Sequence, residues 1–132
     1  MNTLQNRLVY ANQVILSQAD FFQPDNFTRV TGLTVAQLQL VVFHNNVAQP
    51  WSFVSGVGTT DVQVASGMVY WSEIPTNLGF YSVRWRPHAL GYWRLVFTYT
   101  AGQQILSQDY DVVLGGATYD SGLRESFIKP SC

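Results

Sequence analysis

The stretch Gly79-Phe-Tyr-Ser-Val-Arg-Trp-Arg-Pro87, followed by Gly91-Tyr-Trp-Arg-Leu-Val-Phe-Thr-Tyr99, decides the fold. In its first part, large apolar residues at positions 81, 83 and 85 alternate with polar residues until Pro87 ends the run. In its second part, positions 93, 95, 97 and 99 carry the apolar residues. A period of two is typical of a β-strand with one buried face. The sequence therefore predicts two strands, each with one row of side chains in a core.

Similar alternation extends along the chain in both directions. Residues 105–112 predict a last strand that follows a turn at 101–104, with Tyr110 and Val112 facing the core. Residues 38–43 predict another strand, with the row of Leu38 facing inward and a turn at 44–46 after it. Shorter strands are predicted at 27–30, 51–54, 62–65 and 68–71, and no segment has the period of an amphipathic helix. About seven short strands with regular turn signals predict an all-β fold, an antiparallel immunoglobulin-like β-sandwich.

Residues 79–113 resemble the end of a filamin-type immunoglobulin-like repeat. That family has the pattern Gly-x-Tyr-x-Val-x-Tyr-x-Pro, a corner with Gly, an aromatic-rich strand ending in Tyr, and a last strand with Ser-Pro-Phe-x-Val. Here Trp85 replaces the second Tyr, Trp93 stands at the corner, and Gln108-Asp109-Tyr110 replaces Ser-Pro-Phe. The resemblance implies the fold, whereas the actin binding of filamins is not carried over, because one fold hosts many functions.

The composition favours contacts with other proteins. Aromatic residues make up 14% of the 132 residues and charged residues only 11%, with a net charge of -1. Interfaces are enriched in aromatic residues and Arg and depleted in Lys and Glu, and weak net charge favours association. The same charge balance argues against nucleic acid or an anionic membrane as partner. Because the first residues lack a signal-peptide pattern and no apolar stretch could span a bilayer, we expect a soluble protein made in the cytoplasm.

We expect three regions in the chain. Residues 1–26, rich in Asn and Gln, are predicted to form an extended N-terminal arm with at most one strand, at 14–16, that packs on its own domain or on a neighbour. Residues 27–115 are predicted to form the sandwich. Residues 116–132 are predicted to form a polar C-terminal tail that ends at Cys132, the single cysteine, which is a spectator thiol or an intermolecular disulfide partner.

No pattern of catalytic or metal-binding residues stands out. His44 and His88 fall in predicted turns without neighbouring ligands at metal-site spacing. Asp109 and Asp111 are predicted on the outward face of the last strand, where solvation explains them. We therefore expect a protein that is not an enzyme and has no cofactor or metal.

The residues predicted to contact partners are aromatic, arginine or apolar side chains placed outward by strand parity or carried by the arm and tail. They are Tyr10, Phe21, Phe22, Phe80, Arg84, Arg86, Tyr92, Arg94, Phe127 and Ile128. Single modules of this kind, poor in Lys and flanked by polar segments, also look like virion proteins of tailed bacteriophages. That similarity implies a capsid cement or decoration protein that binds the major capsid protein, or another virion subunit, and its own copies, with a trimer as the expected homo-oligomer. The alternative is a tail or adsorption component that binds a carbohydrate or host receptor through Trp51, Tyr70 and Trp71.

Overall fold

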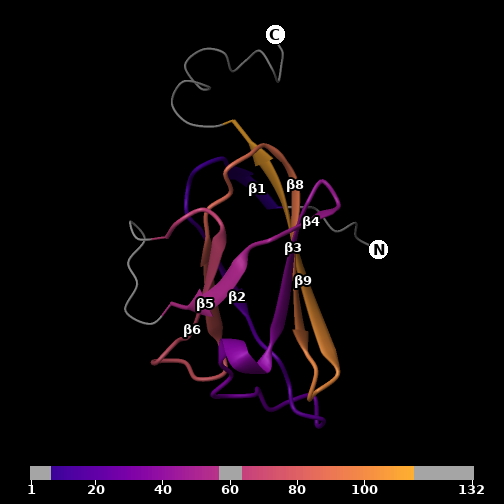
Figure 1. Cartoon of the computed structure of the whole chain (residues 1–132). Coiled ribbons are helices and arrows are strands. Elements are labelled where there is room, and N and C mark those ends of the chain that lie inside the picture. The colour runs from indigo at the N-terminus through magenta and orange to yellow at the C-terminus, as the bar shows by residue number, and fades with distance from the viewer. Residues whose placement is uncertain (1–6, 57–63, 115–132) are drawn as a thin grey trace.

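The computed structural model describes residues 7–56 and 64–114, which form two stacked β-sheets (Figure 1). The described strands are β1 (Arg7–Tyr10), β2 (Ile15–Ala19), β3 (Gln39–His44), β4 (Val47–Gln49), β5 (Ser52–Ser55), β6 (Met68–Glu73), β7 (Tyr81–Trp85), β8 (Gly91–Tyr99) and β9 (Gln104–Val113). One turn of 3-10 helix, η1 (Val35–Gln37), precedes β3. The described residues contain no α-helix, and hence none long and apolar enough to cross a membrane.

The order of the strands is that of an immunoglobulin-like sandwich. One sheet has the order β1-β9-β8-β3-β4 and the other has the order β2-β7-β6-β5. In immunoglobulin domains, strands C, F and G form the centre of one sheet while strands B, E and D lie together in the other. Here β3, β8 and β9 take the first three places and β2, β7 and β6 take the second three. The predicted fold class is therefore confirmed.

The prediction of purely antiparallel sheets is wrong, because each sheet contains one parallel pair. β1 pairs with β9 in parallel, and β5 pairs with β6 in parallel. The remaining strand pairs are antiparallel. Both parallel pairs arise where a strand joins its sheet without a hairpin to its neighbour, since a tight hairpin produces only antiparallel pairs.

The core lies between the sheets and is largely aromatic. The inward rows of β7 and β8 predicted by the alternation are buried except for Tyr99, which is partly buried, and Trp85 and Trp93 have no exposed surface. Their rings lie 5.6 Å apart, and Trp85 meets the ring of Tyr110 from β9 at 5.1 Å. Each fully buried side chain of this size contributes about 1.5–3 kcal/mol or more to stability. The predicted alternation therefore identifies the centre of the core.

The prediction of an extended arm is wrong for residues 7–22, which belong to the sandwich. β1 joins the five-stranded sheet and β2 joins the four-stranded sheet, so the chain crosses between sheets at residues 11–14. Val9, Ile15 and Phe21 are buried. The crossing breaks the period of two, which explains why the sequence shows no periodicity here. Residues 1–6 lie outside the described part.

The predicted turns are found where Asn and Gln adopt positive φ angles. Asn45 and Asn46, with φ of 50° and 68°, connect β3 to β4. Gln103, with φ of 56°, ends the turn between β8 and β9. No strand forms at 27–30, where the β-pairing is limited to one isolated bridge between Phe22 and Arg29. Of the strand predicted at 62–65, residues 62 and 63 lie outside the described residues, and residues 64 and 65 form no strand. The tail predicted at 116–132 lies entirely outside the described residues.

Candidate functional site

The loop Gln23–Thr28 closes on itself at one end of the sandwich. Its ends are joined by a hydrogen bond from the Gln23 N–H to the Thr28 carbonyl oxygen at 2.8 Å. Inside the loop, the Asp25 carboxylate accepts from the N–H groups of Phe27 at 2.8 Å and Thr28 at 2.9 Å, and from the Thr28 hydroxyl at 2.7 Å. These bonds, led by that of the Thr28 N–H, lower the pKa of Asp25 below its usual value. At neutral pH the carboxylate therefore holds the loop in one shape.

The loop presents Phe27 to solvent. The Phe27 side chain is 85% exposed, more than any other large apolar side chain in the described residues. A ring of this size gains about 1.5–3 kcal/mol when it is buried. Since the Phe27 N–H is bonded to Asp25, the backbone under this ring is fixed before any partner arrives.

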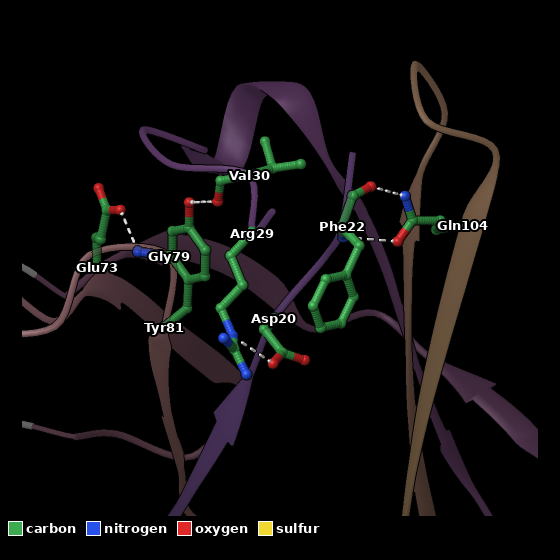
Figure 2. A network of polar contacts seen from close by, with 8 residues as sticks. All are labelled: Asp20, Phe22, Arg29, Val30, Glu73, Gly79, Tyr81 and Gln104. Carbon is green, nitrogen blue, oxygen red and sulfur yellow. Dashed lines mark hydrogen bonds and ion pairs between the residues drawn. The ribbon is translucent and has the colours of Figure 1, made fainter. Parts of the chain in front are cut away.

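The five-stranded sheet holds the loop through one side chain. The amide of Gln104, the first residue of β9, bonds both backbone polar groups of Phe22 (Figure 2). Its Oε1 accepts from the Phe22 N–H at 2.9 Å, and its Nε2 donates to the Phe22 carbonyl oxygen. The chain entering the loop is therefore fastened to the end of β9.

The four-stranded sheet holds the chain that leaves the loop. The Tyr81 hydroxyl at the start of β7 donates to the Val30 carbonyl oxygen at 2.7 Å (Figure 2). It also accepts from the Leu33 N–H at 3.1 Å. Burial is the main cause that raises the pKa of Tyr81 above its usual value, so the hydroxyl keeps its proton at neutral pH. The Glu73 carboxylate at the end of β6 accepts from the N–H groups of Gly32 at 3.1 Å and Gly79 at 2.9 Å. Both sheets thus clamp the segment that carries Phe27.

Arg29 ties the two sides of the clamp together. Its Nε donates to the Asp20 carboxylate at 3.0 Å (Figure 2). Its guanidinium carbon lies 4.0 Å from the ring centre of Phe80 and 5.2 Å from that of Phe22. Gly79 leaves room for this side chain, since a Cβ there would lie 2.7 Å from the Arg29 Cβ. With φ of +90°, position 79 also favours glycine.

A shallow hollow of about 520 Å³ lies beside the loop, between residues 22–26 and the turn at 101–104. It is lined by Phe22, Gln23, Pro24, Asn26, Ala101, Gly102, Gln103 and Gln104. None of these eight lining residues carries a charge. The end of the sandwich therefore offers one projecting aromatic ring beside a neutral surface rich in amide groups.

Most of the aromatic residues predicted to contact a partner instead pack against other side chains of the same chain. Phe21 is 1% exposed and packs in the core, so its prediction as a contact residue is wrong. Phe22 and Phe80 are half-buried beneath Arg29, and Tyr92 is half-buried with the Arg94 guanidinium 5.7 Å from its ring centre. Tyr10 is 39% exposed. Phe127 and Ile128 lie outside the described residues.

The three predicted arginines bond within the chain. Arg84 donates to the Gly56 carbonyl oxygen at 3.2 Å, and Arg86 donates to the carbonyl oxygens of Val64 and Asn12 at 2.9 and 2.6 Å. Arg94 pairs with Asp109 at 2.9 Å. Arg84 and Arg94 lie on strands of different sheets, so they do not form one basic patch.

Of the two histidines, His44 is partly buried, whereas His88 is exposed as predicted for a turn residue. His44 stacks on the buried ring of Trp93 at 4.3 Å, and its Nε2 lies 2.8 Å from the Leu90 carbonyl oxygen. His88 is exposed and lies 6.5 Å from His44 between ring centres. No group of three His, Cys, Asp or Glu residues able to hold a metal ion occurs in the described residues. The Trp71 ring is 2% exposed, with its Nε1 donating to the Leu33 carbonyl oxygen at 3.0 Å.

Phe27 is not among the contact residues predicted from the sequence, because the pattern predicts a strand at 27–30. The signal that identifies the loop is Asp25 followed by Thr28, because an Asp side chain bonds backbone N–H groups two and three residues further on.

No family model matches the chain, and no curated protein matches it. Among solved structures, two titin domains are similar. One is the M4 domain in a trigonal crystal form, with a TM-score of 0.36, 11% identity and coverage of 83% of this chain and 86% of that chain. The other is the M3 domain, with a TM-score of 0.36, 13% identity and coverage of 81% and 86%.

Proposed function

We propose that this chain is a structural virion protein, a cement or decoration module that stabilises a phage head by binding the capsid lattice and its own copies. In this proposal it is made in the host cytoplasm and acts on the virion. The observation that carries the proposal is Phe27, an almost fully exposed ring on a loop clamped by both sheets. In this proposal the module acts by burying surface against its partner and catalyses no reaction.

The clamp makes Phe27 a suitable anchor. Binding energy at protein interfaces is concentrated in a few residues, often aromatic, that fill pockets on the partner. Ordering a loop on binding costs free energy, and a loop already held in its bound shape avoids that cost. Because the bonds of Asp25 and Gln104 already order the loop, little of the binding free energy from burying Phe27 would be lost to ordering it.

The chemistry of the loop favours a protein partner with an apolar socket and a neutral polar rim. The single carboxylate of the loop, that of Asp25, is already bonded to Phe27 and Thr28. The neighbouring hollow is lined by amides and small side chains without charge. The major capsid protein or another virion subunit is the partner we propose. The expected trimer and the filamin-type resemblance of residues 79–113 belong to the same proposal.

We place the alternative, a tail or adsorption component that binds a carbohydrate, second. Sugar platforms need open aromatic faces, whereas Trp71 is buried and Trp51 is half-buried, with its ring 5.9 Å from that of Trp85. Tyr70 is half-buried, and its hydroxyl lies 3.4 Å from the Met68 sulfur.

Phage particles assembled without this chain provide the test. Adding the purified chain should saturate a fixed number of sites per particle and raise the temperature at which the particles release their DNA. Binding to tails alone, or binding without any change in release temperature, would contradict the cement function.

A further inference from the structure

A small pocket lies between the chain that enters η1 and the ends of β5 and β6. Its lining includes the apolar side chains of Leu33, Val35 and Trp71, and its volume is about 230 Å³. Two of these residues hold each other in place, because the Trp71 Nε1 donates to the Leu33 carbonyl oxygen at 3.0 Å. Pockets for small molecules usually have volumes of about 300 Å³ or more. This pocket is therefore sized for a single apolar side chain of a protein.

The pocket has one charged residue in its lining, Glu73. The Glu73 carboxylate accepts from the N–H groups of Gly32 at 3.1 Å and of Gly79 at 2.9 Å, and Figure 2 shows the second bond. Both donors are neutral, and among the described residues no cationic side chain pairs with Glu73. A partner that places a cation beside its apolar side chain therefore complements this pocket in charge.

The C-terminal tail carries this combination of residues. Phe127 and Ile128 are the only two consecutive large apolar residues of 115–132, and they are followed by Lys129, the single lysine of the chain. In an extended segment, alternate side chains point to the same side. The ring of Phe127 and the ammonium group of Lys129 can therefore face one surface together.

We propose that Phe127 of one copy enters this pocket on a second copy, where Lys129 pairs with the Glu73 carboxylate. The contact joins two different surfaces, so it links copies head to tail. Such a contact forms a closed ring when its rotation allows, and the expected trimer is a ring of this kind.

The dimensions of the domain favour a contact between copies. η1 precedes β3 at the end of the sandwich where β9 begins, so the pocket and the end of β9 lie at opposite ends (Figure 1). β9 spans about 30 Å, and the sheets lie about 10 Å apart. The chain from Leu114 to Phe127 reaches at most about 45 Å when fully extended. To fill the pocket of its own copy, the tail would have to run almost straight along the domain, at a large cost in conformational entropy. In a head-to-tail arrangement, the end of β9 in one copy instead faces the pocket end of the next.

The inference rests on the proposed function only in its reference to the chain's own copies, and it names the surfaces that they use. Sedimentation equilibrium of the full chain, under reducing conditions and without capsids, tests it separately from Phe27. The wild type should associate into a closed ring as its concentration rises. A wild type that stays monomeric at all concentrations would overturn the proposal, including the case in which the tail fills the pocket of its own copy.

A mixture of two variants tests whether the pocket and the tail meet between copies. Val35→Asp places a carboxylate in the pocket and Phe127→Asp places one on the tail, so each variant alone should associate at least about tenfold more weakly than the wild type. An equimolar mixture retains one intact contact, between the tail of the first variant and the pocket of the second, and should form a heterodimer. A mixture that stays monomeric contradicts the head-to-tail contact.

Ala36→Asp is the matched control for the pocket variant. Ala36 is the exposed neighbour of Val35 on η1 and does not line the pocket. Ala36→Asp should associate like the wild type, and urea unfolding of both variants shows whether each is folded. Equal weakening by Val35→Asp and Ala36→Asp would rule out the pocket as the contact surface.

Substitutions at position 129 test the charge pairing without altering the described residues. Lys129→Glu places a second carboxylate against Glu73 and should weaken association about fivefold, whereas Lys129→Arg should preserve it. Association of Lys129→Glu with the strength of the wild type would overturn the pairing of Lys129 with Glu73.

Discussion

The side-chain amide of Gln104 bonds both backbone polar groups of Phe22, a residue 82 positions earlier in the chain. One side chain at the start of β9 thereby takes the place of a strand partner for the chain that enters the Phe27 loop. Tyr81 does the same for the chain that leaves it, through Val30 and Leu33. The loop is thus part of the rigid sandwich.

Gln104→Ala should destabilise the protein by about 1–3 kcal/mol, because two partly buried backbone groups of Phe22 lose their partner. Urea unfolding followed by tryptophan fluorescence measures this difference. Gln18→Ala, which truncates an exposed amide on β2, is the control and should change stability by less than about 0.5 kcal/mol. Equal effects of the two substitutions would contradict the clamp.

Tyr81→Phe should also cost about 1–3 kcal/mol. The substitution keeps the ring in the core but leaves the N–H of Leu33 and the carbonyl oxygen of Val30 without the hydroxyl. Tyr70→Phe is the matched control, because its hydroxyl contacts the sulfur of Met68 at the surface. Thermal unfolding of both variants measures the effect, and a neutral Tyr81→Phe would show that the hydroxyl does not hold the loop.

The Phe27 loop should open in acid. The pKa of Asp25 is lowered in the folded state below its ordinary value of 3.8, mainly by the N–H of Thr28 and then by that of Phe27. Its contribution to loop stability is therefore fully present above pH 3.8 and is lost as the pH falls through the lower folded value. Amide chemical shifts of Phe27 and Thr28 against pH measure this midpoint. Asp25→Ala should open the loop at every pH, and a midpoint at or above 3.8 would contradict the bonding.

The fold was largely predictable from sequence because alternation reports burial directly. β7, β8 and β9 each keep one face in the core, and their inward rows were assigned correctly. The failure at residues 7–22 has a physical cause. β1 and β2 are short and belong to different sheets, so no single period spans them. The parallel pairing of β1 with β9 depends on residues about 100 positions apart, which local patterns do not reveal.

Most of the candidate site could not be predicted from the sequence. Strand parity places Arg84 and Arg94 outward, but it cannot show that both bond within the chain. Phe21 and Phe27 look equivalent in the sequence, yet one is in the core and the other is 85% exposed. That difference is set by Asp25 and Gln104, whose partners are backbone groups that carry no sequence signature.

The central claim is that Phe27 anchors the module to its partner, and the affinity of Phe27→Ala for purified capsids that lack this chain tests it most directly. The account predicts a loss of about 2 kcal/mol or more, roughly thirtyfold in affinity, with unfolding stability unchanged because the ring makes little contact with its own fold. Leu90→Ala, which shortens another exposed apolar side chain in a different loop, should bind like the wild type. If Phe27→Ala binds as tightly as the wild type and Leu90→Ala, the ring is not the anchor.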